Sequence, residues 1–310
     1  MNGVLIIDKP SGKTSYNIVE DVKKTLCARK VGHTGTLDPL ATGVLPVCIN
    51  EATKLVQFFS MDNKEYRATM LLGVETDTLD IEGKIIARKE PHITKSDIEG
   101  VLRGFMGKIE QHPPRYSAVK FKGKPMYKWA RSGSTVNPLP RIIEIHQITL
   151  EKVEFPYVTF LVSCSKGTYI RSLCSDIGKR LGCGACLAGL RRIRSGHFVE
   201  EAAISLENIH GRQKGEILGK KVITMVDALS CFSTIAVDQK LAGRLREGYQ
   251  PTIGDLADNH VPLLAAGDVV KFVSGGSCLV ALARMLYSFD EISLLDSRKQ
   301  LVKILRVFNC

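Results

Sequence analysis

No run of apolar residues in this 310-residue chain reaches the ~20 residues that a membrane-spanning helix needs. The apolar stretch at residues 4–7 is too short for the core of a secretory signal peptide, and no basic segment precedes it. We therefore expect residues 4–7 to form a buried strand. The same absences predict a cytoplasmic protein with no membrane among its partners.

A second closely spaced cysteine pair is also missing. Nine cysteines are scattered along the chain, and Cys183 and Cys186 form the only Cys-x-x-Cys. A structural zinc site needs a further pair, whereas Cys164 and Cys174 lie ten residues apart. The odd, scattered set favours reduced thiols over a disulfide framework. The sequence thus predicts no metal site, with Cys183 and Cys186 packed in a glycine-rich turn.

The sequence lacks a complete phosphate-binding loop as well. Gly12-Lys13-Thr14 follows a predicted strand, as the end of such a loop does, but position 7 is Ile where the loop needs its first Gly. Pro10 adds a kink that the loop does not have. A nucleotide hydrolase is therefore the less favoured alternative.

Internal repeats and low-complexity segments are absent, and 44% hydrophobic residues are enough to bury a substantial core. The length suits one large and one small domain. Strand and helix patterns are interleaved irregularly rather than as a β-α-β repeat, which favours an α+β fold. Helices are predicted over residues 15–24, with Ser15 as the cap, 94–103 and 170–181, and strands over 66–72, 142–153, 157–164, 268–273, 278–284 and 301–308.

Positive charge, by contrast, is abundant. The formal net charge is +11 and the pI is about 9.2, which suits a polyanionic partner. Residues 115–141 hold seven Lys or Arg, no Asp or Glu, and four aromatics that include the only tryptophan, Trp129. Residues 166–194 hold seven Lys or Arg against one acid, Asp176. Because cations follow phosphates and aromatic rings stack on unpaired bases, this composition predicts RNA binding.

Residues 32–46 carry the most specific signal: Gly-His-Thr-Gly-Thr-Leu-Asp-Pro-Leu-Ala-Thr-Gly-Val-Leu-Pro. One carboxylate, Asp38, stands among three glycines and two prolines, with His33 five residues before it. Pro39 restricts the backbone of Asp38, and glycines allow close approach to a ligand. The segment therefore displays a single acid on a stiff, irregular loop; a capped tight turn is the alternative.

This segment resembles the catalytic loop of the TruB family, the tRNA pseudouridine-55 synthases. The resemblance covers most of the first 200 residues, with motifs in the same order and spacing. The further matching motifs are Asp8-Lys9-Pro10, Glu65-Tyr66-Arg67, residues 113–120, 123–131 and 164–172, and the segment 182–192.

The resemblance implies a role for each matching residue. It makes Asp38 the nucleophile, Arg171 its partner, and Tyr66 the residue that stacks on the target base and later acts in proton chemistry. Without it, Arg171 would be a phosphate contact and Tyr66 a core residue. The remaining implied roles are these: His33 fills the space left by the flipped base, Tyr169 lines the pocket, Leu190 contacts the base, Lys9 supports the catalytic loop, and Arg131 belongs to the insertion that clasps tRNA.

The resemblance also implies the architecture and the partners. Residues 1–232 would form a pseudouridine synthase domain with a mixed, mainly antiparallel sheet, an insertion at about 110–140 and a connector at about 207–232. Residues 233–310 resemble a PUA domain, a small RNA-binding β pseudobarrel. The expected activity is isomerisation of uridine 55 in the tRNA T-arm by a monomer, without guide RNA, cofactor or metal. A non-catalytic RNA-binding protein or RNA chaperone is the alternative, and the sequence leaves open whether Asp38 attacks C6 of the base or C1′ of the ribose.

Overall fold

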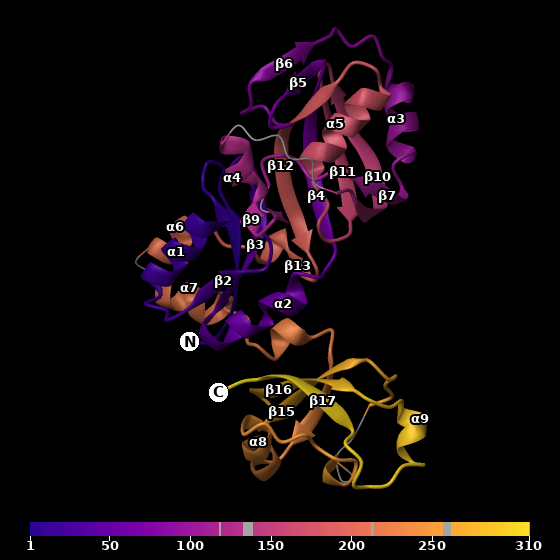
Figure 1. The fold of residues 1–310 in the computed structure, drawn as a ribbon. Coiled ribbons are helices and arrows are strands. Elements are labelled where there is room, and N and C mark those ends of the chain that lie inside the picture. The colour runs from indigo at the N-terminus through magenta and orange to yellow at the C-terminus, as the bar shows by residue number, and fades with distance from the viewer. Residues whose placement is uncertain (118, 133–138, 212–213, 257–261, 310) are drawn as a thin grey trace.

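Two β-sheets organise the chain in the computed structural model, which describes residues 1–117, 119–132, 139–211, 214–256 and 262–309 (Figure 1). Within these residues, the larger sheet has nine strands, and every pairing is antiparallel except that of β3 with β12. The predicted mixed, mainly antiparallel sheet is confirmed. Its strands, in spatial order, are β1 (Gly3–Lys9), β3 (Thr42–Ile49), β12 (Ala185–Ser195), β4 (Lys64–Leu72), β11 (Tyr157–Cys164), β10 (Arg141–Glu154) and β7 (Gly107–Gln111), with β2 (Val31–His33) beside β3 and β13 (Phe198–Val199) beside β12.

Strand β4 crosses the middle of this sheet and shows why the strands form. Its residues alternate between buried and half-buried positions over its whole length. This period of two is that of a pleated strand with one face in the core. The buried set includes Tyr66, Ala68, Met70 and Leu72. The alternation therefore fixes Tyr66 on the inner face, next to the cavity described below.

The N-terminal capping residue of helix α1 (Ser15–Thr25) lies one position before the predicted one. The cap is Thr14, whose side chain accepts from the N–H of Asn17 while Asn17 returns a bond to the Thr14 backbone. The prediction of Ser15 as the cap is therefore wrong. The Ser15 hydroxyl is buried and bonds the backbone of Leu37, accepting from its N–H at 2.8 Å, so it ties the helix to the segment that carries Asp38.

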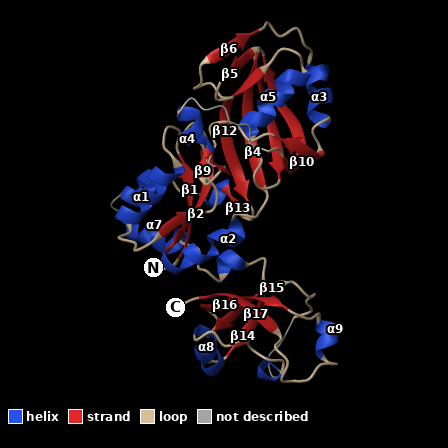
Figure 2. Cartoon of the chain, viewed as in Figure 1, coloured by secondary structure: helices blue, strands red, loops and turns tan. Residues whose placement is uncertain are grey.

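Helices α3 (Lys95–Arg103) and α5 (Ile170–Arg180) pack against each other on the large sheet (Figure 2). Both agree with the prediction, and Thr94 and Asp97 form the capping box of α3. The remaining short elements of this part are β5 (Val74–Thr76), β6 (Ile85–Arg88), η1 (Asn50–Leu55), α2 (Val56–Phe59), β8 (Lys120–Phe121), β9 (Lys124–Pro125), α4 (Met126–Arg131), η2 (Glu200–Ala202), α6 (Leu206–His210), α7 (Lys214–Lys221) and η3 (Asp227–Leu229).

The C-terminal part forms a separate four-stranded sheet in the order β14-β15-β16-β17. Gly275 and Gly276 adopt positive φ in the predicted hairpin between β15 and β16, a conformation that favours glycine. The predicted small C-terminal β-rich unit is thus present. Its elements are β14 (Ser233–Val237), α8 (Gln239–Arg246), η4 (Gly254–Leu256), β15 (Val269–Ser274), β16 (Cys278–Met285), α9 (Phe289–Ile292) and β17 (Val302–Val307).

The two sheets share an apolar core. Leu279, Leu282 and Phe308 of the C-terminal part are buried in one cluster with Leu55 and Phe59 of η1 and α2. Burial of this many apolar side chains holds the two parts together. The C-terminal sheet is therefore packed on the larger part of the chain rather than tethered to it by a loose linker.

One lysine reinforces that junction with polar contacts. The Lys54 ammonium donates to the Val307 carbonyl at 2.9 Å and lies 5.7 Å from the centre of the Phe308 ring. It also pairs with Glu51, whose carboxylate accepts from the Asn309 N–H at 3.2 Å. Residues 307–309 are therefore fastened to η1.

The described residues contain no helix long and apolar enough to cross a membrane. Seven cysteines, including Cys183 and Cys186, are free thiols, as predicted. Cys278 is disulfide-bonded, so the expectation of reduced thiols is wrong at that position.

Candidate active site

The segment that carries Asp38 is held from below by a buried lysine. Lys9 has no exposed surface, and its ammonium donates to the carbonyls of Pro10 at 2.9 Å, Pro39 at 3.1 Å and Ala41 at 2.6 Å. Burial lowers the pKa of Lys9 to about 8, while the nearby Asp38 carboxylate opposes that shift. Two of these bonds hold the backbone that directly follows Asp38, and the third ties it to Pro10.

Arg192 holds the same segment from the neighbouring strand. It is 1% exposed, and it donates from Nε to the Val44 carbonyl at 2.7 Å and from Nη2 to the Gly35 carbonyl at 3.1 Å. Gly43, paired with Arg192 across the parallel β3–β12 contact, has φ +96° and leaves no room for a Cβ. Glycine thus lets β3 approach β12 closely enough for Arg192 to reach the loop.

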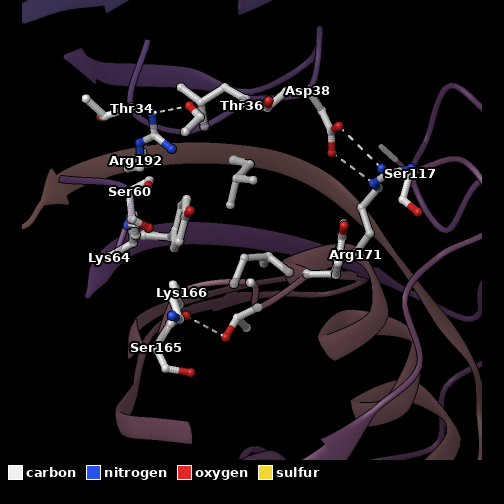
Figure 3. Close-up of a pocket in the computed structure, with 18 of the residues that line it drawn as sticks. Thr34, Thr36, Asp38, Ser60, Lys64, Ser117, Ser165, Lys166, Arg171 and Arg192 are labelled. Atoms are coloured by element: carbon white, nitrogen blue, oxygen red, sulfur yellow. Dashed lines mark hydrogen bonds and ion pairs between the residues drawn. The ribbon is translucent and has the colours of Figure 1, made fainter. Parts of the chain in front are cut away.

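Asp38 and Arg171 form a two-point ion pair at the mouth of a cavity (Figure 3). Nε of Arg171 lies 2.9 Å from Oδ2 of Asp38, and Nη2 lies 3.3 Å from Oδ1. The guanidinium also donates to the carbonyls of Thr78 at 3.1 Å and Tyr116 at 2.9 Å. These backbone contacts fix the plane of Arg171, so it presents a set geometry to the carboxylate.

A second carboxylate stands behind Arg171. Asp80 is 5% exposed, and its Oδ2 lies 3.5 Å from Nη1 of Arg171. Its Oδ1 accepts from the Thr78 hydroxyl at 2.6 Å and from the Glu82 N–H at 3.2 Å. Arg171 therefore lies between two carboxylates, of which only Asp38 faces the cavity.

Burial and charge act in opposite directions on Asp38. Burial raises the pKa of Asp38 above its ordinary value of 3.8, the Arg171 guanidinium opposes this, and the Asp80 carboxylate adds to the rise. The net pKa shift is upward. The ion pair is therefore what keeps the carboxylate available as an anion in a site that disfavours charge.

The cavity beside this pair has a volume of about 580 Å³ and is lined by Tyr66, Tyr169 and Leu190 together with Asp38 and Arg171. This volume lies in the range of small-molecule sites. Burial raises the pKa of both tyrosines above 10, so each phenol is neutral near pH 7. A largely apolar space of this volume, with one carboxylate in its lining, suits a single nucleobase.

Two buried side chains position the rim of this cavity. Lys64, 6% exposed, donates to the Ser60 and Asp62 carbonyls, and burial lowers its pKa to about 8. The Gln111 amide accepts from the Tyr169 N–H at 2.8 Å and donates to the Tyr169 carbonyl at 3.0 Å. Gln111 therefore fixes the residue that begins the helix bearing Arg171.

The structure brings together most of the predicted site residues but not all of them. Asp38, Arg171, Tyr66, Tyr169 and Leu190 share the cavity, with Lys9 beneath the loop. His33 does not line the cavity; it ends β2 one residue before Thr34, which does. Arg131 ends α4, and its side chain lies outside the described part of the chain.

Cys183 and Cys186 are both buried, as predicted. Cys186 lies in β12 and pairs with Leu71 of β4, so the prediction that both cysteines lie in a turn is wrong for Cys186. Where the structure is described, no group of three His, Cys, Asp or Glu side chains could hold a metal ion.

Sequence reasoning missed Asp80, Arg192, Lys64 and Gln111. Arg192 and Gln111 act through backbone atoms of distant segments, and Asp80 acts through Arg171. Lys64 bonds the carbonyls of the turn just before its own strand. The available signal was chemical: a charged residue on the buried face of a strand, such as Arg192 or Lys64, must find partners.

A solved structure with the same fold identifies the class. The chain aligns with the Cbf5-Nop10-Gar1 complex at a TM-score of 0.75 and 30% identity, covering 99% of this chain and 85% of that one. An H/ACA RNP bound to a substrate RNA containing 2′-deoxyuridine aligns equally well, with a TM-score of 0.75 and 28% identity over 99% of this chain and 85% of that one. The fold is that of the Cbf5 and TruB type of pseudouridine synthase.

The family follows from the sequence matches. Residues 23–170 match the TruB family pseudouridylate synthase (N terminal domain), and residues 171–228 match the tRNA pseudouridylate synthase B C-terminal domain. "tRNA pseudouridine synthase B" of Syntrophus aciditrophicus (strain SB) is 54% identical over 309 residues, covering 100% of this chain and 99% of that protein. The protein of the same name from Geobacter sulfurreducens is 40% identical over the full length of both. This chain belongs to the TruB family.

Proposed function

We propose that this protein isomerises uridine 55 in the T-loop of tRNA to pseudouridine, as a monomer and without guide RNA. The full-length similarity to relatives named tRNA pseudouridine synthase B supports tRNA as the substrate. The observation that carries the chemistry is the two-point pair of Asp38 and Arg171 at the edge of a cavity of nucleobase size. Because tRNA is the substrate, the proposal includes a cytoplasmic location.

Isomerisation breaks the C1′–N1 bond, rotates the uracil and forms a C1′–C5 bond, and the C5 proton is lost as N1 gains one. Asp38, held ionised by Arg171, is the nucleophile, at either C6 of the base or C1′ of the ribose. The target base must leave its stack to reach the cavity. His33 fills the space that the base leaves, while Tyr66 stacks on the base and later takes part in the proton transfer.

The remaining residues bind the base or hold the loop that carries Asp38. Tyr169 and Leu190 line the space that receives the base, and their exclusion of water strengthens the Asp38–Arg171 attraction. Lys9 holds the loop that presents Asp38. No step needs a metal or a cofactor, because the reaction is an isomerisation driven by a carboxylate and proton transfer.

Recognition of the T-arm is assigned to the insertion at residues 110–140. Its described part includes Trp129, which contacts Phe121 edge-on and has the Lys124 ammonium 5.6 Å from its ring centre. Arg131 belongs to the same cationic segment. Tyr116 and Ser117 of the same insertion line the cavity. A segment rich in aromatic rings and cations suits a single-stranded loop, and this supports action without a guide.

The domain division belongs to the same proposal. Residues 1–232 carry the chemistry, with a connector at 207–232, and residues 233–310 are the PUA-like RNA-binding part. This division is supported by the position of every cavity residue before residue 195 and by the separate sheet that begins at Ser233.

The test is direct. Unmodified tRNA is incubated with the purified protein, and pseudouridine at each position is mapped by mass spectrometry of nuclease fragments. We expect one pseudouridine, at position 55, in the absence of any other RNA. Tight tRNA binding with no new pseudouridine would favour the alternative of a non-catalytic RNA chaperone and would overturn the proposal.

A further inference from the structure

A second hollow, of about 440 Å³, lies outside the catalytic cavity, between α1 and β2. We call it the α1–β2 groove. From α1 it is lined by Tyr16, Glu20 and Lys23, which stand on one face of the helix at spacings of four and three residues. On the other side it is lined by β2 and by Arg29 and Lys30, which directly precede that strand.

The groove has an excess of positive charge. Lys23, Arg29 and Lys30 are exposed, and Glu20 is the acid among its lining residues. None of these three cations forms an ion pair with a described side chain. The net charge of the groove is therefore positive and available to an anionic ligand.

Asn50 holds the backbone of two of these cations, Arg29 and Lys30. The Asn50 side-chain oxygen accepts from the N–H of Arg29 at 2.9 Å and of Lys30 at 3.1 Å, and the Asn50 N–H donates to the Lys30 carbonyl at 2.8 Å. Asn50 adopts φ +51°, a left-handed conformation that Asn tolerates better than most residues. These bonds fix the backbone from which the two neighbouring side chains of Arg29 and Lys30 extend.

The groove also displays an aromatic ring. Tyr16 is 67% exposed, in the first turn of α1, although an exposed ring of this size leaves apolar surface in water. An exposed ring among cations is the arrangement by which proteins bind unpaired nucleotides, because bases stack on the ring while cations approach phosphates.

The groove and the catalytic cavity meet along the chain. Gly32 and His33 line the groove, and the next residue, Thr34, lines the cavity. The Nδ1 atom of His33 is buried and has no hydrogen-bond partner among the described residues. The two hollows are therefore adjacent at His33 and Thr34.

We propose that the α1–β2 groove is a second nucleotide site, which takes one unpaired nucleotide of the substrate RNA next to the uridine in the cavity. Its base stacks on Tyr16, and its flanking phosphates lie near Lys23, Arg29 and Lys30. The inference rests on the proposed function, because it takes RNA as the ligand. Continuity with the cavity favours RNA over a free small anion.

The first test is equilibrium binding of a fluorescently labelled T-arm hairpin to the full-length protein, followed by anisotropy. Tyr16→Ala should weaken binding about tenfold, the usual cost of one lost stacking contact, whereas Tyr16→Phe should bind like the wild type. Lys30→Gln should reduce the slope of log affinity against log salt by about 1. Glu20→Gln should strengthen binding.

Lys24→Gln is the matched control. Lys24 is exposed on the same helix and carries the same charge as Lys23, but it does not line the groove. Its loss should change affinity less than the loss of Lys23 or Lys30. Equal effects of the groove cations and Lys24, or a Tyr16→Ala affinity within twofold of the wild type, would overturn the groove as a site.

The second test locates the nucleotide. Hairpins with an abasic residue immediately before or after the target uridine are bound to the wild type and to Tyr16→Ala. If Tyr16 stacks on that base, one abasic hairpin should bind both proteins equally, because the contact is already lost. A Tyr16 effect that is unchanged on both hairpins would contradict the proposal.

These outcomes are separable from those of the proposed function. If no pseudouridine forms at position 55 but Tyr16 and one abasic position remain coupled in binding, the activity is wrong and the groove stands. If pseudouridine forms there and no coupling is found, the groove alone is wrong.

Discussion

Arg171 contacts both carboxylate oxygens of Asp38, with Nε 2.9 Å from Oδ2 and Nη2 3.3 Å from Oδ1. The guanidinium is itself fixed by the carbonyls of Thr78 and Tyr116. Arg171 thus both orients the Asp38 carboxylate and opposes the rise in its pKa that burial causes.

Arg171→Lys should lower kcat by about a hundredfold or more, although the positive charge is kept. A lysine ammonium cannot contact both oxygens in one plane while also holding two backbone carbonyls. Single-turnover rates on T-arm RNA measure the effect, and binding affinity for the same RNA is the control. Rates close to the wild type would mean that Arg171 serves only as a phosphate contact.

Asp80→Asn should lower kcat about tenfold and leave KM nearly unchanged, because Asp80 contacts Arg171 and not the cavity. The acid limb of the rate profile should also move to lower pH, since the Asp80 charge contributes to the raised pKa of Asp38. Asp77→Asn is the matched control: Asp77 is an exposed carboxylate on the same turn. Identical behaviour of the two variants would contradict a positioning role for Asp80.

The raised pKa of Asp38 predicts a loss of activity in mildly acidic solution. Protonation removes the nucleophile, and burial places that protonation above the ordinary pKa of 3.8, despite the opposing Arg171. The rate should therefore fall as the pH drops through the raised pKa. Single-turnover rates measured from pH 8 down to pH 3.8, on RNA that stays folded over that range, test this; a rate that is still flat at pH 3.8 would contradict it.

The same shift has a consequence for stability. Between the unfolded and the raised folded pKa, the folded protein binds the Asp38 proton more tightly, so the contribution of Asp38 to stability falls as pH rises through this window. The ionised carboxylate is thus unfavourable to the fold near pH 7. Thermal melts should show Asp38→Asn to be at least as stable as the wild type there, and a clearly lower Tm would contradict this sign.

Removing residues 235–310 should weaken tRNA binding while leaving kcat on a short T-arm hairpin within about twofold. The cut also uncovers Leu55 and Phe59, which pack against Leu279 and Phe308, so the truncated protein should have a lower Tm. Circular dichroism must first show that it is folded. A folded truncation whose kcat on the hairpin collapses would mean that the C-terminal part helps to build the active site.

The sequence alone predicted what short-range patterns encode. The loop with Asp38, the partner Arg171 and the strand that carries Tyr66 stand in continuous motifs, and the structure places all three in one cavity. The helix cap shows the limit: Thr14 and Ser15 are both good capping residues, and the choice is made by Leu37, to which the Ser15 hydroxyl bonds across the fold.

Other parts of the site depend on long-range contacts that no local pattern reveals. Arg192 is one of several basic residues in its segment, and only the pairing of β12 with β3 shows that it holds the Gly35 carbonyl. Asp80 likewise belongs to the site only because the side chain of Arg171, on α5, contacts it. The sequence predicts a role for His33 in base flipping. Only the fold shows that His33 lines the groove, one residue before Thr34 of the cavity.

The measurement that tests the central claim most directly compares Asp38→Asn with the wild type on tRNA, measuring pseudouridine at position 55 and tRNA affinity in the same preparation. The substitution keeps the size of the side chain and one hydrogen-bond acceptor for Arg171 but removes the nucleophile. We predict no detectable pseudouridine and an affinity close to that of the wild type. Substantial turnover by Asp38→Asn would contradict the assignment of Asp38 and with it the proposed mechanism.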